Sequence, residues 1–239
     1  MTTKNINLQI IVSSIILIFV VTLFQLSELD IFMQSHFFNF ETKKWLVDEN
    51  EPIMKFFFYN GAKNTLLIFA IIILLSLIFF RGNSLIKEYK KGFIIVLLAA
   101  AIIPSVIGSL KAITNTPCPN NINYFGGEYP NIKVFDSYPK DFVQKSKAKC
   151  WPAGHASGGF ALLSLFFLFK TEKNRRKAVI IALIIGWSMG LYKMLVGDHF
   201  LSHTIITMVL SWLIILLIVK LTEKFERYNF EKSTKIQLL

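Results

Sequence analysis

Long runs of apolar residues, almost free of charged side chains, alternate with polar segments along the whole chain of 239 residues. Six runs stand out, at residues 8–26, 65–80, 92–110, 156–169, 178–196 and 204–219. An α-helix needs about 20 apolar residues to cross the hydrocarbon layer of a bilayer. The pattern therefore predicts six membrane-spanning helices, of which the second, fourth and sixth need flanking residues to complete the crossing.

The polar segments differ in character. Residues 27–64 mix aromatic and charged side chains, which predicts amphipathic helices lying in the membrane interface. Residues 111–155 contain clustered Pro, Asn and Gly and predict an irregular loop. No small-residue cleavage site follows the first run, so a retained helix is expected rather than a signal peptide. We find no repeat and no second soluble domain, and we expect one all-α polytopic domain over residues 1–239.

Composition and charge agree with a membrane protein. The chain is 54% hydrophobic and carries a net charge of +11, which excludes an ordinary soluble domain. With the N-terminus inside, 15 of the 26 Lys and Arg lie on the inner side with five acids, whereas the outer side holds 11 basic and ten acidic residues. Cytoplasmic loops carry the excess of basic residues. We therefore attribute the net positive charge to the orientation of the protein in the membrane and to contact with anionic lipid head groups. We expect no nucleic-acid partner.

Three clusters place ionisable groups at the outer ends of predicted helices. They are residues 111–119, residues 151–157 and residues 193–203. Taken singly, a lysine here can extend to the interface, a histidine can cap a helix, and glycines can serve close helix packing. Together they offer two ammonium groups, three imidazoles and a Gly-rich helix start. This is the set that binds a phosphate dianion and attacks or protonates it.

In order and spacing, the clusters resemble the tripartite signature of the type 2 phosphatidic acid phosphatase (PAP2) superfamily, K-x6-R-P, P-S-G-H and S-R-x5-H-x3-D. Lys111 is followed after six residues by Cys118-Pro119. The second element is Pro152-Ala-Gly-His, and the third is Tyr192-Lys with His199 and His203 at the expected spacings. The resemblance implies a bundle of six transmembrane helices with interfacial helices and periplasmic loops, whose catalytic core covers about residues 93–221.

The resemblance also implies roles for individual residues. His199 would be the nucleophile that forms a phosphohistidine, His155 would protonate the leaving group, and His203 would orient His199. The phosphate would be held without a metal or other cofactor by Lys111, Lys193 and the backbone of Ala153 and Gly154.

Four positions depart from the family pattern: Cys118 and Lys193 replace arginines, Ala153 replaces a serine, and His203 replaces the orienting aspartate. Two bidentate phosphate contacts are thereby lost, because lysine acts as a point charge. His203 lies at i+4 from His199, on the same helical face, and a neutral imidazole there can accept a hydrogen bond from the His199 ring.

The implied function is a phosphoric monoester hydrolase of the bacterial inner membrane, with its site facing the periplasm and a membrane lipid as substrate. Lipid A is favoured, since small bacterial members that resemble this chain include lipid A phosphatases, and its 1-phosphate is preferred over the 4′-phosphate. Phosphatidylglycerol phosphate, phosphatidic acid and undecaprenyl pyrophosphate stay open. The sequence indicates no oligomeric state.

Further alternatives follow from the same residues. His155, His199 and His203 are also a possible three-histidine zinc site that activates water. A transporter or channel, or an inactive family member, would use the clusters without hydrolysis. We also expect a disulfide between Cys118 and Cys150, because both lie in one outer loop of an oxidising compartment. Closing such a loop stabilises a protein by roughly 3 kcal/mol in the chain-entropy model.

Overall fold

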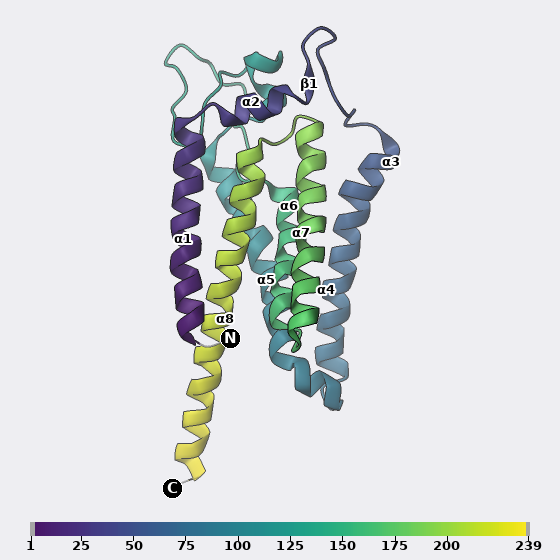
Figure 1. The fold of residues 1–239 in the computed structure, drawn as a ribbon, viewed down its shortest axis with the longest axis vertical. Helices are drawn as coiled ribbons and strands as arrows, with labels where there is room; N and C mark the ends of the chain where they lie inside the picture. The colour runs from purple at the N-terminus through teal and green to yellow at the C-terminus, as the bar shows by residue number, and fades with distance from the viewer. Residues whose placement is uncertain (1–2, 238–239) are drawn as a thin grey trace.

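The structure is a computed structural model that describes residues 3–237. The main helices are α1 (Thr3–Leu26), α4 (Ala62–Phe79), α5 (Ser84–Thr114), α6 (Gly154–Ala161), α7 (Glu172–Leu195) and α8 (Leu201–Gln237). They run along the long axis of the molecule (Figure 1). The small elements α2 (Leu29–Ser35), β1 (Phe38–Asn39) and β2 (Lys44–Trp45) gather with the irregular connection between α5 and α6 at one end, opposite both chain termini.

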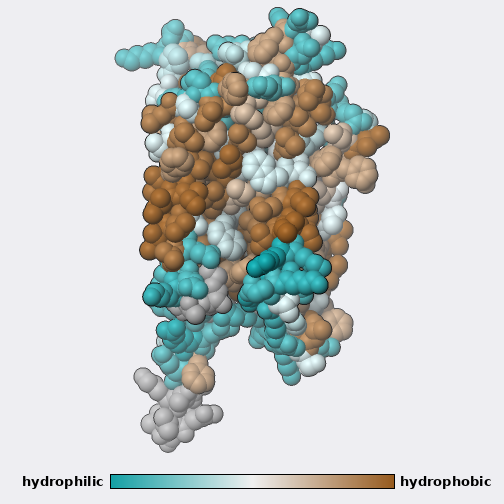
Figure 2. Space-filling view, in the orientation of Figure 1, coloured by the Kyte–Doolittle hydropathy of each residue, from teal (hydrophilic) through white to brown (hydrophobic). Residues whose placement is uncertain are grey.

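Five helical stretches are long and apolar enough to cross a membrane: α1, α5, α7, α8 and the continuous helix Pro52–Phe79. This last stretch joins α3 (Pro52–Lys55), the π-helical turn η1 (Phe56–Gly61) and α4. The five stretches match five of the six predicted runs and confirm an all-α polytopic membrane protein. Figure 2 shows the corresponding hydrophobic band between two hydrophilic ends on the face in view.

The fourth predicted span is shorter than expected. It consists of α6 followed by the 3-10 helix η4 (Leu162–Phe167), and it falls below the length of the other five. Ala156, Phe160 and Leu163 are buried, and α6 packs against α5, α7 and α8. A non-helical backbone is tolerated at membrane depth where protein covers it. The central position of this segment therefore allows a short helix with irregular chain before it.

Local capping explains where the second membrane helix starts. The run was predicted from residue 65, but the helix begins at Pro52. The Glu51 side chain accepts a hydrogen bond from the Met54 backbone N–H, and Pro52 occupies the first helical position. Both features favour a helix start. The aromatic residues that follow were predicted to be interfacial and instead extend the spanning helix.

The first connection, which follows α1, contains a short helix and an element that the sequence pattern missed. The helix α2 lies in the segment for which amphipathic helices were predicted. The next residues form a two-stranded hairpin in which Phe38 pairs with Trp45. Its turn is stabilised by Asn39, whose side-chain oxygen accepts from the backbone N–H groups of Glu41 and Thr42. Each strand has only two residues, which is too short for an alternating pattern to be recognised.

Glycine allows α6 and α7 to approach closely in the centre of the bundle. A Cβ atom placed on Gly159 would lie 2.6 Å from the Cα atom of Gly186, and one on Gly186 would lie 2.4 Å from the Phe160 ring. Real Cβ atoms do not tolerate such distances, so both positions require glycine as long as the helices keep their separation. The α6–α7 contact fixes His155, at the start of α6, relative to the end of α7.

We predict that Gly159→Ala lowers the thermal stability of the detergent-solubilised protein, because the added methyl group forces the two backbones apart. Overpacking of this kind costs about 1–3 kcal/mol. Gly108→Ala on α5 is the matched control, since a Cβ there meets nothing within 4 Å and alanine favours the helix. An equal change in melting temperature for the two variants would contradict the close contact between α6 and α7.

Candidate active site

The three predicted clusters meet at one end of the bundle. The ring centroids of His155 and His199 are 6.3 Å apart, and the Nδ1 atoms of His199 and His203 are 3.4 Å apart. A Cβ placed on Gly154 would lie 3.9 Å from the Lys111 ammonium group. Lys111 and Lys193 are also close enough for their charges to act on His155. The fold thus assembles groups from α5, α6, α7 and α8 around His155 and His199.

His199 is positioned by the way α7 ends. After α7, Gly197 adopts a φ of +79°, the left-handed conformation that glycine enters at no steric cost. The Gly197 N–H donates to the Met194 carbonyl, and the Asp198 N–H donates to the Lys193 carbonyl. These two bonds form a Schellman motif, the common closure of a helix C-terminus. The His199 N–H donates to the Lys193 carbonyl as well, so the residue is held directly against the end of α7.

The first connection packs against this turn and stabilises it. A Cβ placed on Gly197 would lie 2.2 Å from the Trp45 indole, which shows how closely the ring covers the turn. The Val47 N–H donates to the Leu195 carbonyl, and the buried Gln34 amide donates to the Met194 carbonyl at 2.7 Å. The hairpin segment therefore satisfies the Leu195 carbonyl, and α2 gives the Met194 carbonyl a second donor.

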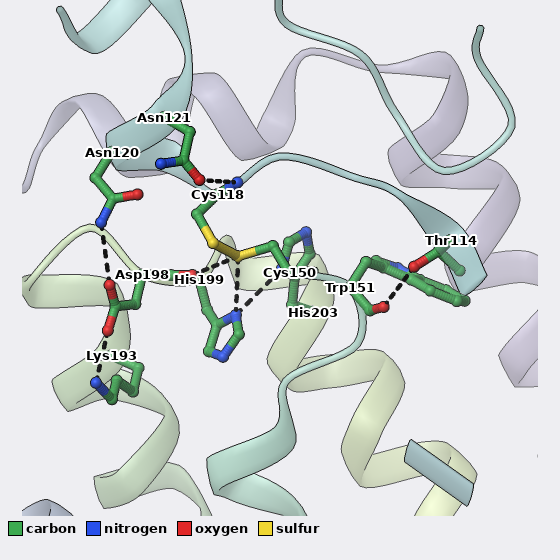
Figure 3. The surroundings of a disulfide bond; sticks show 10 residues. All are labelled: Thr114, Cys118, Asn120, Asn121, Cys150, Trp151, Lys193, Asp198, His199 and His203. Atoms are coloured by element: carbon green, nitrogen blue, oxygen red, sulfur yellow. Dashed lines mark hydrogen bonds and ion pairs between the residues drawn. A yellow bond between two sulfur atoms is a disulfide. The ribbon is translucent and has the colours of Figure 1, made fainter. Parts of the chain in front are cut away.

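The two nitrogens of His199 have different surroundings. Its Nδ1 atom lies 3.4 Å from His203 Nδ1 and 3.5 Å from the Cys150 sulfur. Figure 3 shows the other ring nitrogen, Nε2, pointing away from both. Burial first, and then the neighbouring His203 and Lys111, hold the pKa of His199 well below its usual range. A neutral ring whose Nδ1–H donates to His203 leaves a lone pair on Nε2, which is the requirement for a nucleophile.

Lys193 is already paired. Its ammonium group binds Asp198 Oδ2 at 2.6 Å, and Asp198 Oδ1 accepts from the Asn120 side-chain amide at 3.1 Å (Figure 3). Asp198 was not among the predicted site residues. Its signal in the sequence is that it is the only acid between Glu172 and Glu223. The ion pair joins α7 to the turn before α8, and it neutralises one of the two lysines that were expected to hold a phosphate.

A disulfide joins Cys118 to Cys150, with 5.2 Å between the two Cα atoms. Besides the contact of its Cys150 sulfur with His199, the chain around it is tied to the site by backbone bonds. The Cys150 N–H donates to the Thr116 carbonyl, and the Asn120 N–H donates to the Gly197 carbonyl. Where the family signature has an arginine, Cys118 thus fastens the segment after α5 beside the histidine turn.

The three-histidine metal set does not form among the described residues. The group of potential ligands that does form there comprises Cys150, His199 and His203, whose ligand atoms lie within 4.8 Å of one another. The Cys150 sulfur is bonded to Cys118, so this group offers two imidazole nitrogens and no thiolate. His155 lies outside the group and faces another cavity.

The start of α6 offers fewer free donors than expected. The Ala153 N–H donates to the His203 carbonyl at 3.3 Å, which links α6 to α8 and occupies that donor. Gly154 is the first residue of α6, and the N–H groups of a first helical turn have no partner within the helix. The Gly154 N–H, next to the Lys111 ammonium group, is therefore the better placed of the two predicted backbone donors.

A cavity of about 500 Å³ opens beside His155, between α4, α5 and α6. Its lining is mostly apolar and includes Leu66, Val96 and Ala100. The described part of the lining contains the His155 ring, one ammonium group, that of Lys63, and no carboxylate. Lys63 also acts electrostatically on His155. The sequence pattern gave no reason to select Lys63, because α4 precedes the three clusters.

Comparison with known proteins identifies the family of this arrangement. A family model described as the PAP2 superfamily matches residues 92–227, which is more than half of the chain. Comparisons with curated proteins and with solved structures give no match. The matched segment begins in α5 and ends in α8, so it includes all three clusters but excludes α2, the hairpin and α4.

We predict that Gly197→Ala lowers thermal stability more than Gly126→Ala does. Both glycines have a positive φ, so both variants incur the strain of alanine in the left-handed region, about 1–2 kcal/mol. Only at Gly197 does the methyl group also meet the Trp45 ring, whereas a Cβ on Gly126 meets nothing within 4 Å. Thermal unfolding of the purified variants measures the difference, and equal melting temperatures would show that the hairpin does not brace the turn.

Proposed function

Because the chain belongs to the PAP2 superfamily, whose members are in general phosphatases, we propose that it hydrolyses a phosphate monoester on a membrane lipid. The observation that carries this proposal is the apolar cavity of about 500 Å³ that has His155 and Lys63 in its lining. Ligand sites for apolar molecules have this size and this mixture of apolar walls with a few polar groups. An acyl chain fits such a cavity, while the phosphate reaches the histidines.

The proposed reaction proceeds in two displacements at phosphorus. His199 Nε2 attacks the phosphorus atom, the bond from phosphorus to the lipid oxygen breaks, and His155 gives a proton to that oxygen. Water then attacks the phosphohistidine, His155 takes a proton from this water, and inorganic phosphate leaves with Nε2 restored. The negative charge of the bound phosphate favours the protonated form of His155 that the first step needs.

Phosphate binding rests mainly on the unpaired cations. Lys111 and Lys63 both act on His155, and neither takes part in an ion pair within the described residues. Together with the Gly154 N–H, they form the proposed phosphate-binding group: Lys111 is the lysine of the family signature, and Lys63 adds a positive charge from α4. Lys193 contributes through its bond to Asp198, which stabilises the turn that presents His199.

The orientation and the substrate belong to the same proposal. The site lies at the end of the bundle opposite both termini, and the charge asymmetry supports an orientation in which that end faces outward from the inner membrane. A disulfide at this end agrees with the oxidising periplasm. Lipid A, preferably at its 1-phosphate, is the first substrate to test. Phosphatidylglycerol phosphate, phosphatidic acid and undecaprenyl pyrophosphate are the alternatives.

We predict that His199→Ala and His155→Ala each abolish most phosphate release by the purified protein on this lipid panel. Removal of a general acid costs about 10²- to 10⁴-fold in rate, and removal of a nucleophile costs at least as much. Acid-labile, base-stable labelled phosphohistidine is expected in wild-type protein and is absent from His199→Ala. The exposed His36→Ala serves as the control and retains full turnover.

Two results would contradict this reading. Near-normal turnover by His199→Ala would exclude the nucleophile and return attention to metal-activated water. Release of no phosphate from any lipid by wild-type protein would favour an inactive or transport-type member of the family.

We also predict that Ala100→Phe reduces turnover of a long-chain lipid phosphate about tenfold or more, while a soluble phosphomonoester is affected much less. Ala100 lines the cavity, so the phenyl ring occupies space that an acyl chain needs. Ala101→Phe is the matched control, because the neighbouring alanine is exposed on the outer face of α5. Equal activity of the two variants on the lipid would show that the acyl chain binds elsewhere.

A further inference from the structure

His203 stands where the family signature has a carboxylate, and the nearest acid in sequence does not replace that carboxylate. Both oxygens of Asp198 are engaged, one by Lys193 and the other by Asn120. Any carboxylate that supports the pair His199–His203 must therefore come from another part of the chain.

Asp30, on α2, binds the residue that precedes His203. Its Oδ1 atom accepts from the Ser202 N–H at 2.9 Å, and its Oδ2 atom accepts from the Ser202 hydroxyl group at 2.5 Å. Ser202 directly precedes His203 in the first turn of α8. Asp30 thereby satisfies a donor at the start of α8 and brings a carboxylate from outside the matched family segment to this turn.

Asp30 and His203 line one small cavity of about 40 Å³, together with Ser202 and Thr116. The buried Thr116 hydroxyl group has no hydrogen-bond partner within the described residues, so this wall of the cavity is polar and unsatisfied. A water molecule needs about 10–15 Å³ of such space and two to four polar partners. Neither His155 nor His199 lines this cavity, which therefore lies behind the reacting side of the site.

The charges around Asp30 favour an ionised carboxylate at neutral pH. Burial raises the pKa of Asp30 to about 6, while its hydrogen bonds to Ser202 and the charge of Lys133 oppose this rise. Glu28 is the other acid that acts on Asp30, and it is itself paired with Lys133 at 2.8 Å. The groups that act on His203 are the charge of Lys111 and the backbone of Cys150, to which the His203 ring is hydrogen-bonded.

We propose that Asp30 is a positioning residue for the nucleophile, acting on His203 through a water molecule held in this cavity. The water donates to the Asp30 carboxylate and accepts from His203 Nε2–H. This arrangement keeps the proton of His203 on Nε2, so that its Nδ1 accepts from His199 Nδ1–H. His199 Nε2 then carries the lone pair. The inference rests on the proposed phosphatase function, and it supplies from α2 the negative charge that position 203 lacks.

Asp30 has two roles in this account: it caps the start of α8, and it is proposed to position His203. The variant Asp30→Asn separates them. A cap requires an acceptor oxygen, and asparagine keeps one for the Ser202 N–H. Positioning of His203 in the proposed way requires the charge, which asparagine lacks. The melting temperature of Asp30→Asn therefore measures the capping of α8, and its kcat measures the proposed positioning of His203.

The decisive experiment is a double-mutant cycle that combines Asp30→Asn with His203→Asp, measured on the best lipid substrate. In the wild-type background, Asp30→Asn should lower kcat about tenfold or more with little change in KM. In the His203→Asp background, the carboxylate is supplied at position 203, and Asp30→Asn should cost less than about threefold. Asp136→Asn, which removes an exposed carboxylate bound to Gln25, is the control and leaves kcat unchanged.

A pH profile provides the second readout. The wild-type rate should fall as the pH drops through about 6, where Asp30 takes up a proton, and this acid limb should be lost in Asp30→Asn. An equal loss of kcat in both backgrounds, or an unchanged acid limb, would overturn the role of Asp30. If wild-type protein hydrolyses no lipid phosphate, the proposed function fails instead, so the two failures are distinguishable.

Discussion

The closure of α7 at Gly197 is the constraint on which the site depends. A helix must end with its last carbonyls satisfied, and here they are satisfied by the turn itself and by groups from the first connection. Because Gly197 takes the left-handed conformation, the chain reverses within a few residues and places His199 between α7 and α8. The same reversal exposes a flat glycine surface on which the Trp45 ring rests. The position of His199 and the packing of the hairpin are therefore consequences of one backbone turn.

The segments that precede the matched family region complete the site. Gln34 and Asp30, both on α2, bind the two helices on either side of the turn, one at the end of α7 and the other at the start of α8. Lys63, on α4, joins the lining of the apolar cavity. Residues 92–227 carry the three clusters, but they do not by themselves enclose them. Loss of two arginines from the signature is accompanied by charges that arrive from elsewhere in the fold.

Much of this architecture could be predicted from the sequence, because a bilayer imposes a simple length rule on apolar runs. Five spans and the gathering of the clusters at helix ends on one side follow from that rule and from the charge asymmetry. The short α6 could not be predicted, since its brevity depends on cover by α5, α7 and α8. The hairpin was missed because strands of two residues have no periodic signal.

The site shows the same division between local and tertiary information. His155, His199, His203 and Lys111 were found because each follows or precedes an apolar run at a recognisable spacing. Lys193 was found as well, but its role depends on its ion pair with Asp198. That pair is formed by the tertiary structure and cannot be read from the sequence. Asp30 lies in a segment whose charges were attributed to the membrane interface. Only the contact with Ser202, 172 positions away, connects it to the histidines of the site.

The replacement of arginine by Cys118 has a physical consequence beyond the loss of a phosphate contact. An arginine there would act only on bound substrate, whereas the disulfide acts on the free protein as well, by holding the segment after α5 against His199. Its Cys150 sulfur occupies the space beside His199 Nδ1 without offering a strong hydrogen-bond acceptor. Of the two groups beside His199 Nδ1, His203 is thus the better acceptor, and the two distances are similar. The disulfide and the substituted histidine therefore lie together at one side of the His199 ring, and in the proposed mechanism this pair of neighbours leaves Nε2 as the reacting nitrogen.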